Sequence, residues 1–176
     1  ASILMTMFYA FKASGFWLDE RESNALDGAA HFYDTYECAD QKFLAVGSIE
    51  PQFYSVLLEK LEISDLKFQD QHNKELWPEL KSIMKDRIKE KTRDEWAKIF
   101  EGSDACVAPV LSLSEAPDHH HMKARNSFVE VDGITQPAPA PRFSNTTPNI
   151  KHSSVKAGEN NDEICSKYNL DRSCFS

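Results

Sequence analysis

The order of apolar and polar positions along this 176-residue chain predicts an α+β fold. Near the amino terminus, Leu4, Phe8 and Phe11 recur at helical spacing, which predicts a buried helix that ends at Gly15. Residues 31–37 and 43–49 are each typical of a strand, and the short polar break between them predicts a β-hairpin. A helix with an apolar stripe is expected to begin directly after the second strand.

Further helices and extended segments are expected in the rest of the chain. Residues 65–73 are polar and predict a loop, and residues 76–91 predict an amphipathic helix. Thr92 and Glu95 have the spacing of a capping box, so a short helix is expected from there to Gly102. The remaining expectations are an edge strand in the run 106–111, a strand over 127–131, a stiff proline-rich arm over 137–141 and a last helix over 159–168.

Glu50 occupies the junction between the second strand of the hairpin and the helix that follows it. Pro51 suits the first turn of that helix, because a missing N–H costs nothing there. A carboxylate at such a junction lies at the positive end of the helix dipole and at the edge of the fold, where it can orient a catalytic group. An ordinary helix cap occupies the same position, and the spacing alone leaves both interpretations open.

Composition and charge limit the classes of partner. The net charge of −8 argues against a nucleic-acid or anionic-membrane surface, because both need clustered lysines and arginines. The four cysteines lack the spacing of a zinc or redox pair, which favours free thiols in a reducing compartment. The apolar opening is too short to span a bilayer. The last residues, 173–176, do not form a peroxisomal signal, so a bacterial cytoplasmic or a mitochondrial location is expected.

Other motifs with a chemical role are scarce. His119, His120 and His121 are adjacent, so they cannot all point at one ion from a regular element, and a solvated loop is expected there instead of a metal site. The sequence has no glycine-rich phosphate loop and no nucleophile elbow. Glu50 is therefore the one candidate functional carboxylate, and the chain holds no complete catalytic set.

Three segments resemble the racemase branch of the class III CoA-transferase family. They are residues 26–36 (LDGAAHFYDTY), 45–54 (AVGSIEPQFY) and 104–111 (DACVAPVL), and the likeness extends to residue 143. The first two together are typical of the racemases, whereas the third is shared more widely. Gln41 and Asn126 stand where the family usually has glycine. We expect a different hairpin turn at Gln41 and a preserved backbone at Asn126, since asparagine tolerates positive φ.

The resemblance implies the small domain of a class III CoA-transferase-like fold, flanked by segments of a larger α/β domain. Residues 1–27 would end the first segment of the large domain, residues 28–135 would form the small α+β domain, and residues 136–176 would be an extended arm and return segment. Two chains would interlock as a homodimer, with the active site between the large domain of one and the small domain of the other. No cofactor is implied, because the acyl-CoA thioester is the substrate.

The resemblance also assigns roles to individual residues. Glu50 would orient a catalytic His that lies outside this chain segment, and Leu26 and Ile49 would lie near the acyl chain. The implied reaction is epimerisation of a 2-methylacyl-CoA at its α-carbon, by removal and return of a proton through an enolate. Because the CoA site and the proton-transferring His and Asp would lie before Ala1, this segment alone is expected to be inactive.

Two alternatives stay open beside the racemase. The chain can be a portion of a class III acyl-CoA:carboxylate CoA-transferase, in which an Asp carries the acyl group covalently. It can also be a non-catalytic α+β module for binding or dimerisation. A His–Asp pair upstream would favour the racemase and a lone nucleophilic Asp the transferase. The sequence Ile49-Glu50-Pro51-Gln52 favours the racemase.

Overall fold

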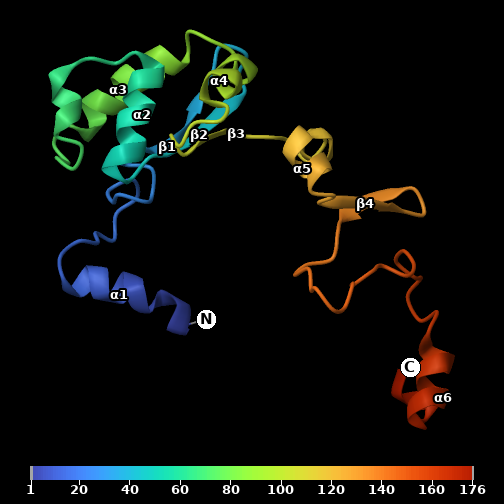
Figure 1. Ribbon diagram of the computed structural model, residues 1–176. Helices are drawn as coiled ribbons and strands as arrows, with labels where there is room; N and C mark the ends of the chain where they lie inside the picture. The colour runs from blue at the N-terminus through green and yellow to red at the C-terminus, as the bar shows by residue number, and fades with distance from the viewer. Residues whose placement is uncertain (1, 176) are drawn as a thin grey trace. The chain divides into compact units, whose positions relative to one another are not determined.

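The computed structural model describes residues 2–175, which group into two units, Ala1–Val110 and Leu111–Ser176 (Figure 1). The first unit contains α1 (Thr6–Ala13), β1 (Tyr33–Glu37), β2 (Phe43–Gly47), α2 (Pro51–Leu61), α3 (Trp77–Ile88), α4 (Arg93–Phe100) and β3 (Val107–Pro109). The second contains α5 (His120–Ala124), β4 (Phe128–Val131), β5 (Ile134–Pro137) and α6 (Asn161–Tyr168). The expected α+β class is confirmed, whereas the domain boundaries at residues 27 and 135 stay predictions.

The predicted hairpin forms the centre of the first unit. β1 and β2 pair antiparallel, with Tyr33 opposite Gly47, and β3 adds to β2 as the expected edge strand. The backbone of Gln41 is left-handed in the hairpin turn, at φ +63°, and Asn126 adopts φ +48°. Both residues therefore take up a conformation that glycine adopts most easily, which agrees with the expectation that the backbone at Asn126 is preserved.

Helices cover one face of this sheet. α3 contacts β1, and α4 contacts β2 and β3. The capping box that opens α4 is confirmed, because Thr92 Oγ1 accepts from Glu95 N–H at 3.3 Å and Glu95 Oε2 accepts from Thr92 N–H at 2.8 Å. The core between sheet and helices is mostly apolar, with His31 and Asn24 buried beside it; its largest apolar and aromatic side chains are Trp96, Tyr36, Phe32, Phe68, Leu44, Leu57, Leu61, Leu80, Met84 and Ile88.

Two expectations about local structure, at the amino-terminal helix and at the histidines, are wrong, and a third, the loop 65–73, is incomplete. The amino-terminal helix forms, preceded by a 3-10 turn over Ser2–Met5, but none of its residues is buried; Phe8 packs against Trp17 and stays half-exposed. The expected loop 65–73 contains a 3-10 turn over Leu66–Gln69, which the Asp65 side chain starts by accepting from Lys67 N–H. His120 and His121 lie in α5 instead of a loop.

The second unit is a hairpin followed by an irregular segment and a helix. β4 pairs antiparallel with β5, an additional strand that takes in the first proline of the predicted arm. α6 confirms the last expected helix, and short 3-10 turns lie at Ala116–Asp118 and Arg172–Phe175. Over residues 2–175, every helix is too short or too polar to traverse a lipid bilayer.

Candidate functional site

Glu50 lies where the sequence places it, between the end of β2 at Gly47 and the start of α2 at Pro51. Its backbone is extended, at φ −73° and ψ 140°, and it is the N-cap residue of α2. Its side chain is exposed and makes no cap hydrogen bond to the helix. The interpretation of Glu50 as a plain helix cap therefore lacks the hydrogen bond that gives a cap its stabilising effect. The carboxylate is presented outwards from a rigid strand-to-helix junction.

Buried polar groups hold that junction from below. Ser48 is fully buried; its N–H donates to Phe32 O at 3.0 Å, and its hydroxyl donates to Ala105 O. Gln71, which is 6% exposed, donates from Nε2 to Ser48 O at 3.1 Å and to Ile49 O at 3.0 Å. No local pattern singles out Gln71, because it belongs to a polar stretch expected to be an ordinary loop.

His31 and Tyr54 form a second buried pair next to the start of α2. The His31 ring is fully buried, and its Nε2 lies 2.7 Å from the Tyr54 hydroxyl oxygen, while Nδ1 has no partner. Burial, helped by the nearby His72, lowers the pKa of His31 from 6.5 to about 4, so its ring is neutral at pH 7. Tyr54 N–H donates to Glu50 O at 2.9 Å. The His31 imidazole is therefore part of the buried core, and its one hydrogen-bond partner among the described residues is the Tyr54 hydroxyl.

Leu26 and Ile49 line one cavity of about 480 Å³, which we call the aromatic pocket. Most of its lining is aromatic or aliphatic, with three polar side chains, and consists of Phe8, Phe11, Phe16, Trp17, Asn24, Ala25, Leu26, Ile49, His72, Lys74 and Trp77. The structure thus brings together the two residues predicted to lie near an acyl chain. Glu50 follows Ile49 directly in the chain but is not among the lining residues.

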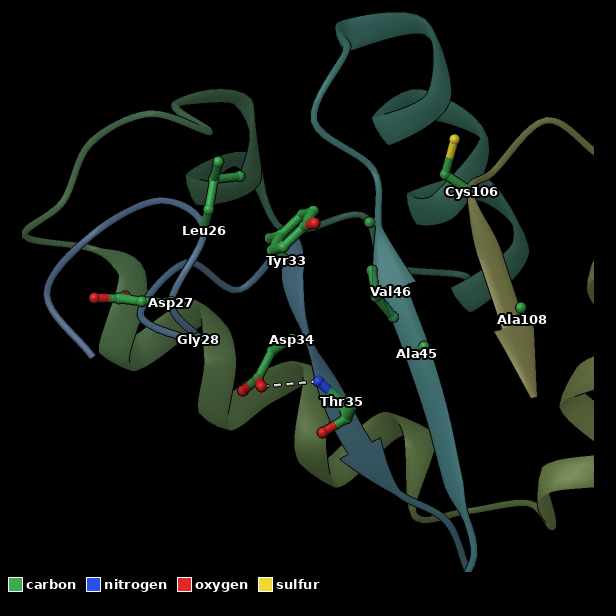
Figure 2. A pocket seen from close by; sticks show the side chains of 11 residues that line it. Leu26, Asp27, Gly28, Tyr33, Asp34, Thr35, Ala45, Val46, Cys106 and Ala108 are labelled. Carbon is green, nitrogen blue, oxygen red and sulfur yellow. Dashed lines mark hydrogen bonds between the residues drawn. The ribbon is translucent and has the colours of Figure 1, made fainter. Parts of the chain in front are cut away.

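A second cavity of about 440 Å³, which we call the sheet-face pocket, lies over the outer face of the three-stranded sheet (Figure 2). Small residues contribute to its lining, among them Ala45 and Gly47 of β2 and Ala108 of β3. Leu26 lines this pocket as well as the aromatic pocket. Cys106 lies at its β3 edge. Burial, followed by the negative charges of Glu50 and Asp104, raises the pKa of the Cys106 thiol.

The loop that carries Leu26 is fixed by its own polar side chains. Asn24 is 2% exposed and bridges the backbone of Leu18, accepting from its N–H at 2.8 Å and donating to its carbonyl at 3.0 Å. The Asp27 carboxylate accepts from Asn24 Nδ2 at 2.7 Å and from the N–H groups of Ser23, Asn24 and Ala29. Burial opposes ionisation of Asp27, but these hydrogen bonds outweigh it and hold its pKa below the ordinary value.

Metal ligands do not gather in the part of the chain that the structure describes. Over residues 2–175, no three His, Cys, Asp or Glu side chains lie together as an ion would require. His119 and His120 stack with their ring centroids 4.4 Å apart, without a carboxylate or thiolate completing a set.

Comparisons with known proteins agree on one family. The model of CoA-transferase family III matches residues 1–161. Alpha-methylacyl-CoA racemase from Mus musculus is 41% identical over 169 residues, covering 94% of this chain and 44% of that protein. The Homo sapiens protein of the same name is 42% identical over 159 residues, covering 89% and 41%. The crystal structure of a CaiB/BaiF family protein from Brucella suis has a TM-score of 0.66 at 21% identity, covering 94% of this chain and 44% of that one. The chain spans less than half the length of these relatives.

Proposed function

Because the chain belongs to CoA-transferase family III, we propose that it forms a portion of a 2-methylacyl-CoA racemase, an isomerase that inverts the α-carbon of branched acyl-CoA thioesters. The identity of 41–42% to two proteins named alpha-methylacyl-CoA racemase supports the isomerase over the transferase. The substrate would be the acyl-CoA thioester, with no further cofactor. The enzyme would be a homodimer in the bacterial cytoplasm or in mitochondria.

The observation that carries this proposal is the convergence of Leu26 and Ile49 on the aromatic pocket. Its volume of about 480 Å³ falls in the range of about 300 to 1,000 Å³ that is usual for small-molecule sites. An acyl chain in this pocket would gain the free energy of apolar burial against Phe11, Trp17 and Trp77. Since Glu50 directly follows Ile49, the reacting end of such a chain would lie towards the strand-to-helix junction.

The chemistry needs more than a base. A thioester α-carbon is a weaker acid than an imidazolium by on the order of a dozen pK units, or roughly 16 kcal/mol at about 1.36 kcal/mol per unit. Stabilisation of the enolate by aimed donors must offset much of this difference. A carboxylate that hydrogen-bonds an imidazole fixes its tautomer and favours the imidazolium form. We assign this role to Glu50, acting on a His outside the chain described here.

The exposed amino-terminal helix supports the placement of further protein next to this unit. Ile3 is 87% exposed, Leu4 is 83% exposed and Tyr9 is 69% exposed, so α1 and the turn before it expose several large apolar side chains. Apolar patches of this kind are typical of protein–protein interfaces. In our proposal this surface is covered by the large domain or by the partner chain of the homodimer.

Replacement of the Glu50 carboxylate tests the proposal. Glu50→Gln in the complete protein should lower kcat for exchange of the α-proton of a 2-methylacyl-CoA with deuterated solvent by about 10² to 10⁴. KM and the thermal unfolding midpoint should change little, because the Glu50 side chain makes no cap hydrogen bond. Proton exchange is followed by NMR and unfolding by circular dichroism.

Glu59→Gln is the matched control, because Glu59 is an exposed carboxylate on the same helix. It should retain the parental kcat. An unchanged kcat in Glu50→Gln would leave Glu50 with no role beyond its position as the N-cap residue of α2. If the protein exchanges no α-proton but transfers CoA to a free carboxylate, the transferase alternative holds instead.

A further inference from the structure

Gln71 joins two segments on which the proposed function depends. We propose that Gln71 is a positioning residue for Glu50: its side-chain amide holds the strand-to-helix junction in the conformation that aims the carboxylate. This inference rests on the proposed role of Glu50. It adds a residue that lies 21 positions away in the sequence and does not touch the substrate.

The side-chain amide of Gln71 bonds to two successive carbonyls of the junction. The amide nitrogen of Gln71 carries two hydrogens, and each is directed at one of two successive carbonyls, Ser48 O at 3.1 Å and Ile49 O at 3.0 Å. The Ile49 carbonyl belongs to the peptide group that Glu50 completes. Fixing that peptide fixes the direction in which the Glu50 side chain leaves the backbone.

The junction needs such a partner because it belongs to neither regular element. β2 ends at Gly47, so the carbonyls of Ser48 and Ile49 are beyond the pairing with β1 and β3. α2 begins at Pro51, which has no N–H to donate. Polar backbone groups that are shielded from water require a partner, and Gln71 supplies it to both carbonyls.

Gln71 is itself anchored to the aromatic pocket. Its backbone carbonyl accepts from Trp77 Nε1–H at 2.8 Å, and Trp77 lines the pocket together with His72, the next residue after Gln71. Trp77 is 4% exposed and starts α3. The wall of the pocket and the seat of Glu50 are therefore parts of one hydrogen-bonded unit, and a displacement of Gln71 would reach the carboxylate.

A double-mutant cycle in the complete protein separates positioning from general stability. Gln71→Met preserves the volume of the side chain and removes both donors. In the otherwise unchanged protein it should lower kcat for α-proton exchange by about 10- to 100-fold, with KM changed less than about threefold. In a Glu50→Gln background it should lower kcat by less than about threefold further, because the carboxylate that it positions is already gone.

Gln69→Met is the control, since Gln69 is an exposed glutamine at the end of the neighbouring 3-10 turn, and it should retain the parental kcat. If Gln71→Met does not fold, Gln71→Asn and Gln71→Glu take its place in the cycle. Asparagine preserves the amide on a shorter stem and should lose less activity than glutamate, which has no donors when ionised.

The outcomes separate the inference from the function on which it rests. An equal loss of kcat in both backgrounds would mean that Gln71 acts only through the stability of the fold, and would overturn the inference while leaving the role of Glu50 intact. If Glu50→Gln has no effect on kcat, the proposed role of Glu50 fails, and the inference fails with it. A loss confined to the Glu50 background supports both.

Discussion

The two units of the chain reach order by different means. In the first unit, buried residues extend from Asn24 to Ala105 and include two tryptophans, with the sheet on one side and α2, α3 and α4 around them. Among the described side chains of the second unit, none is buried, and Leu113, Phe143 and Tyr168 are each more than half exposed. The first unit has a core of its own, whereas local hydrogen bonds and the β4–β5 pairing order the second.

The difference shows where a candidate site can be built from this chain. Orienting Glu50 demands a scaffold that holds backbone atoms to within a fraction of an ångström, and only close packing supplies that. The strand-to-helix junction lies on such a scaffold. The second unit offers hairpin and helix surfaces with little apolar burial, so its described residues supply no comparable scaffold.

The strongest test of this contrast removes the same side chain from each unit. Leu57 on α2 is 0% exposed and Leu170 after α6 is 46% exposed. Leu57→Ala should lower the free energy of unfolding by about 2 to 5 kcal/mol, because it leaves a cavity in a packed core. Leu170→Ala should cost no more than about 0.5 kcal/mol. Urea unfolding measures both variants when it is followed by the fluorescence of buried Trp77 and Trp96 in the first unit and by far-UV circular dichroism, which reports on the helices of both units.

Equal losses in the two variants would contradict the contrast, because they would show that Leu170 is packed as tightly as Leu57. Leu57→Met serves as a control for the site. It conserves volume and apolar character, so it should cost less than about 1.5 kcal/mol.

Features that depend on neighbouring residues were predictable from the sequence. The hairpin, the start of α2 at Pro51 and the capping box of Thr92 and Glu95 each depend on residues within a few positions of one another, and the structure has all of them. The position of Glu50 as N-cap follows for the same reason. Its proposed catalytic role came from the family resemblance, and no local rule supplies it.

Features that depend on distant residues were not predictable. Gln71 bonds to Ser48 and Ile49, which lie more than 20 positions away in the sequence. The spacing of apolar residues does not indicate that a glutamine in a loop is buried. The exposure of α1 is the converse case. The spacing of Leu4, Phe8 and Phe11 correctly predicted a helix. Whether that helix is buried depends on the segments that pack against it, and the spacing carries no information about them.

A pH dependence of intermediate size distinguishes a buried histidine in the first unit from an exposed one in the second. The pKa of His31 is about 4 in the folded chain and 6.5 without burial, so the unfolded chain binds more protons between these values. Stability is therefore complete above about pH 6.5 and falls as the pH is lowered towards 4. The full loss is on the order of 3 kcal/mol. Urea midpoints measured from pH 7 to 5, above most carboxyl titrations, should show its first part.

The control replaces the pair as a unit. His31→Phe combined with Tyr54→Phe removes the titrating ring and the hydroxyl that it leaves without a partner, and should abolish the slope between pH 6.5 and 5. His152→Gln should leave the slope unchanged, because His152 is exposed in the second unit. A slope that survives in the double variant would assign the acid sensitivity to other groups.

The smallest expected effect comes from removing the N-cap side chains of two eight-residue helices, α4 in the first unit and α6 in the second. Thr92 caps α4 through its hydroxyl, whereas Asn160, in the corresponding position before α6, makes no side-chain cap hydrogen bond. Thr92→Ala should therefore cost about 1 kcal/mol and raise the amide exchange rate of α4 about fivefold, while Thr92→Ser should restore protection. Asn160→Ala should change the exchange rate of α6 less than about twofold. A comparable rise in α6 would mean that Asn160 caps its helix in solution, and that the second unit uses the same local device as the first without a core to reinforce it.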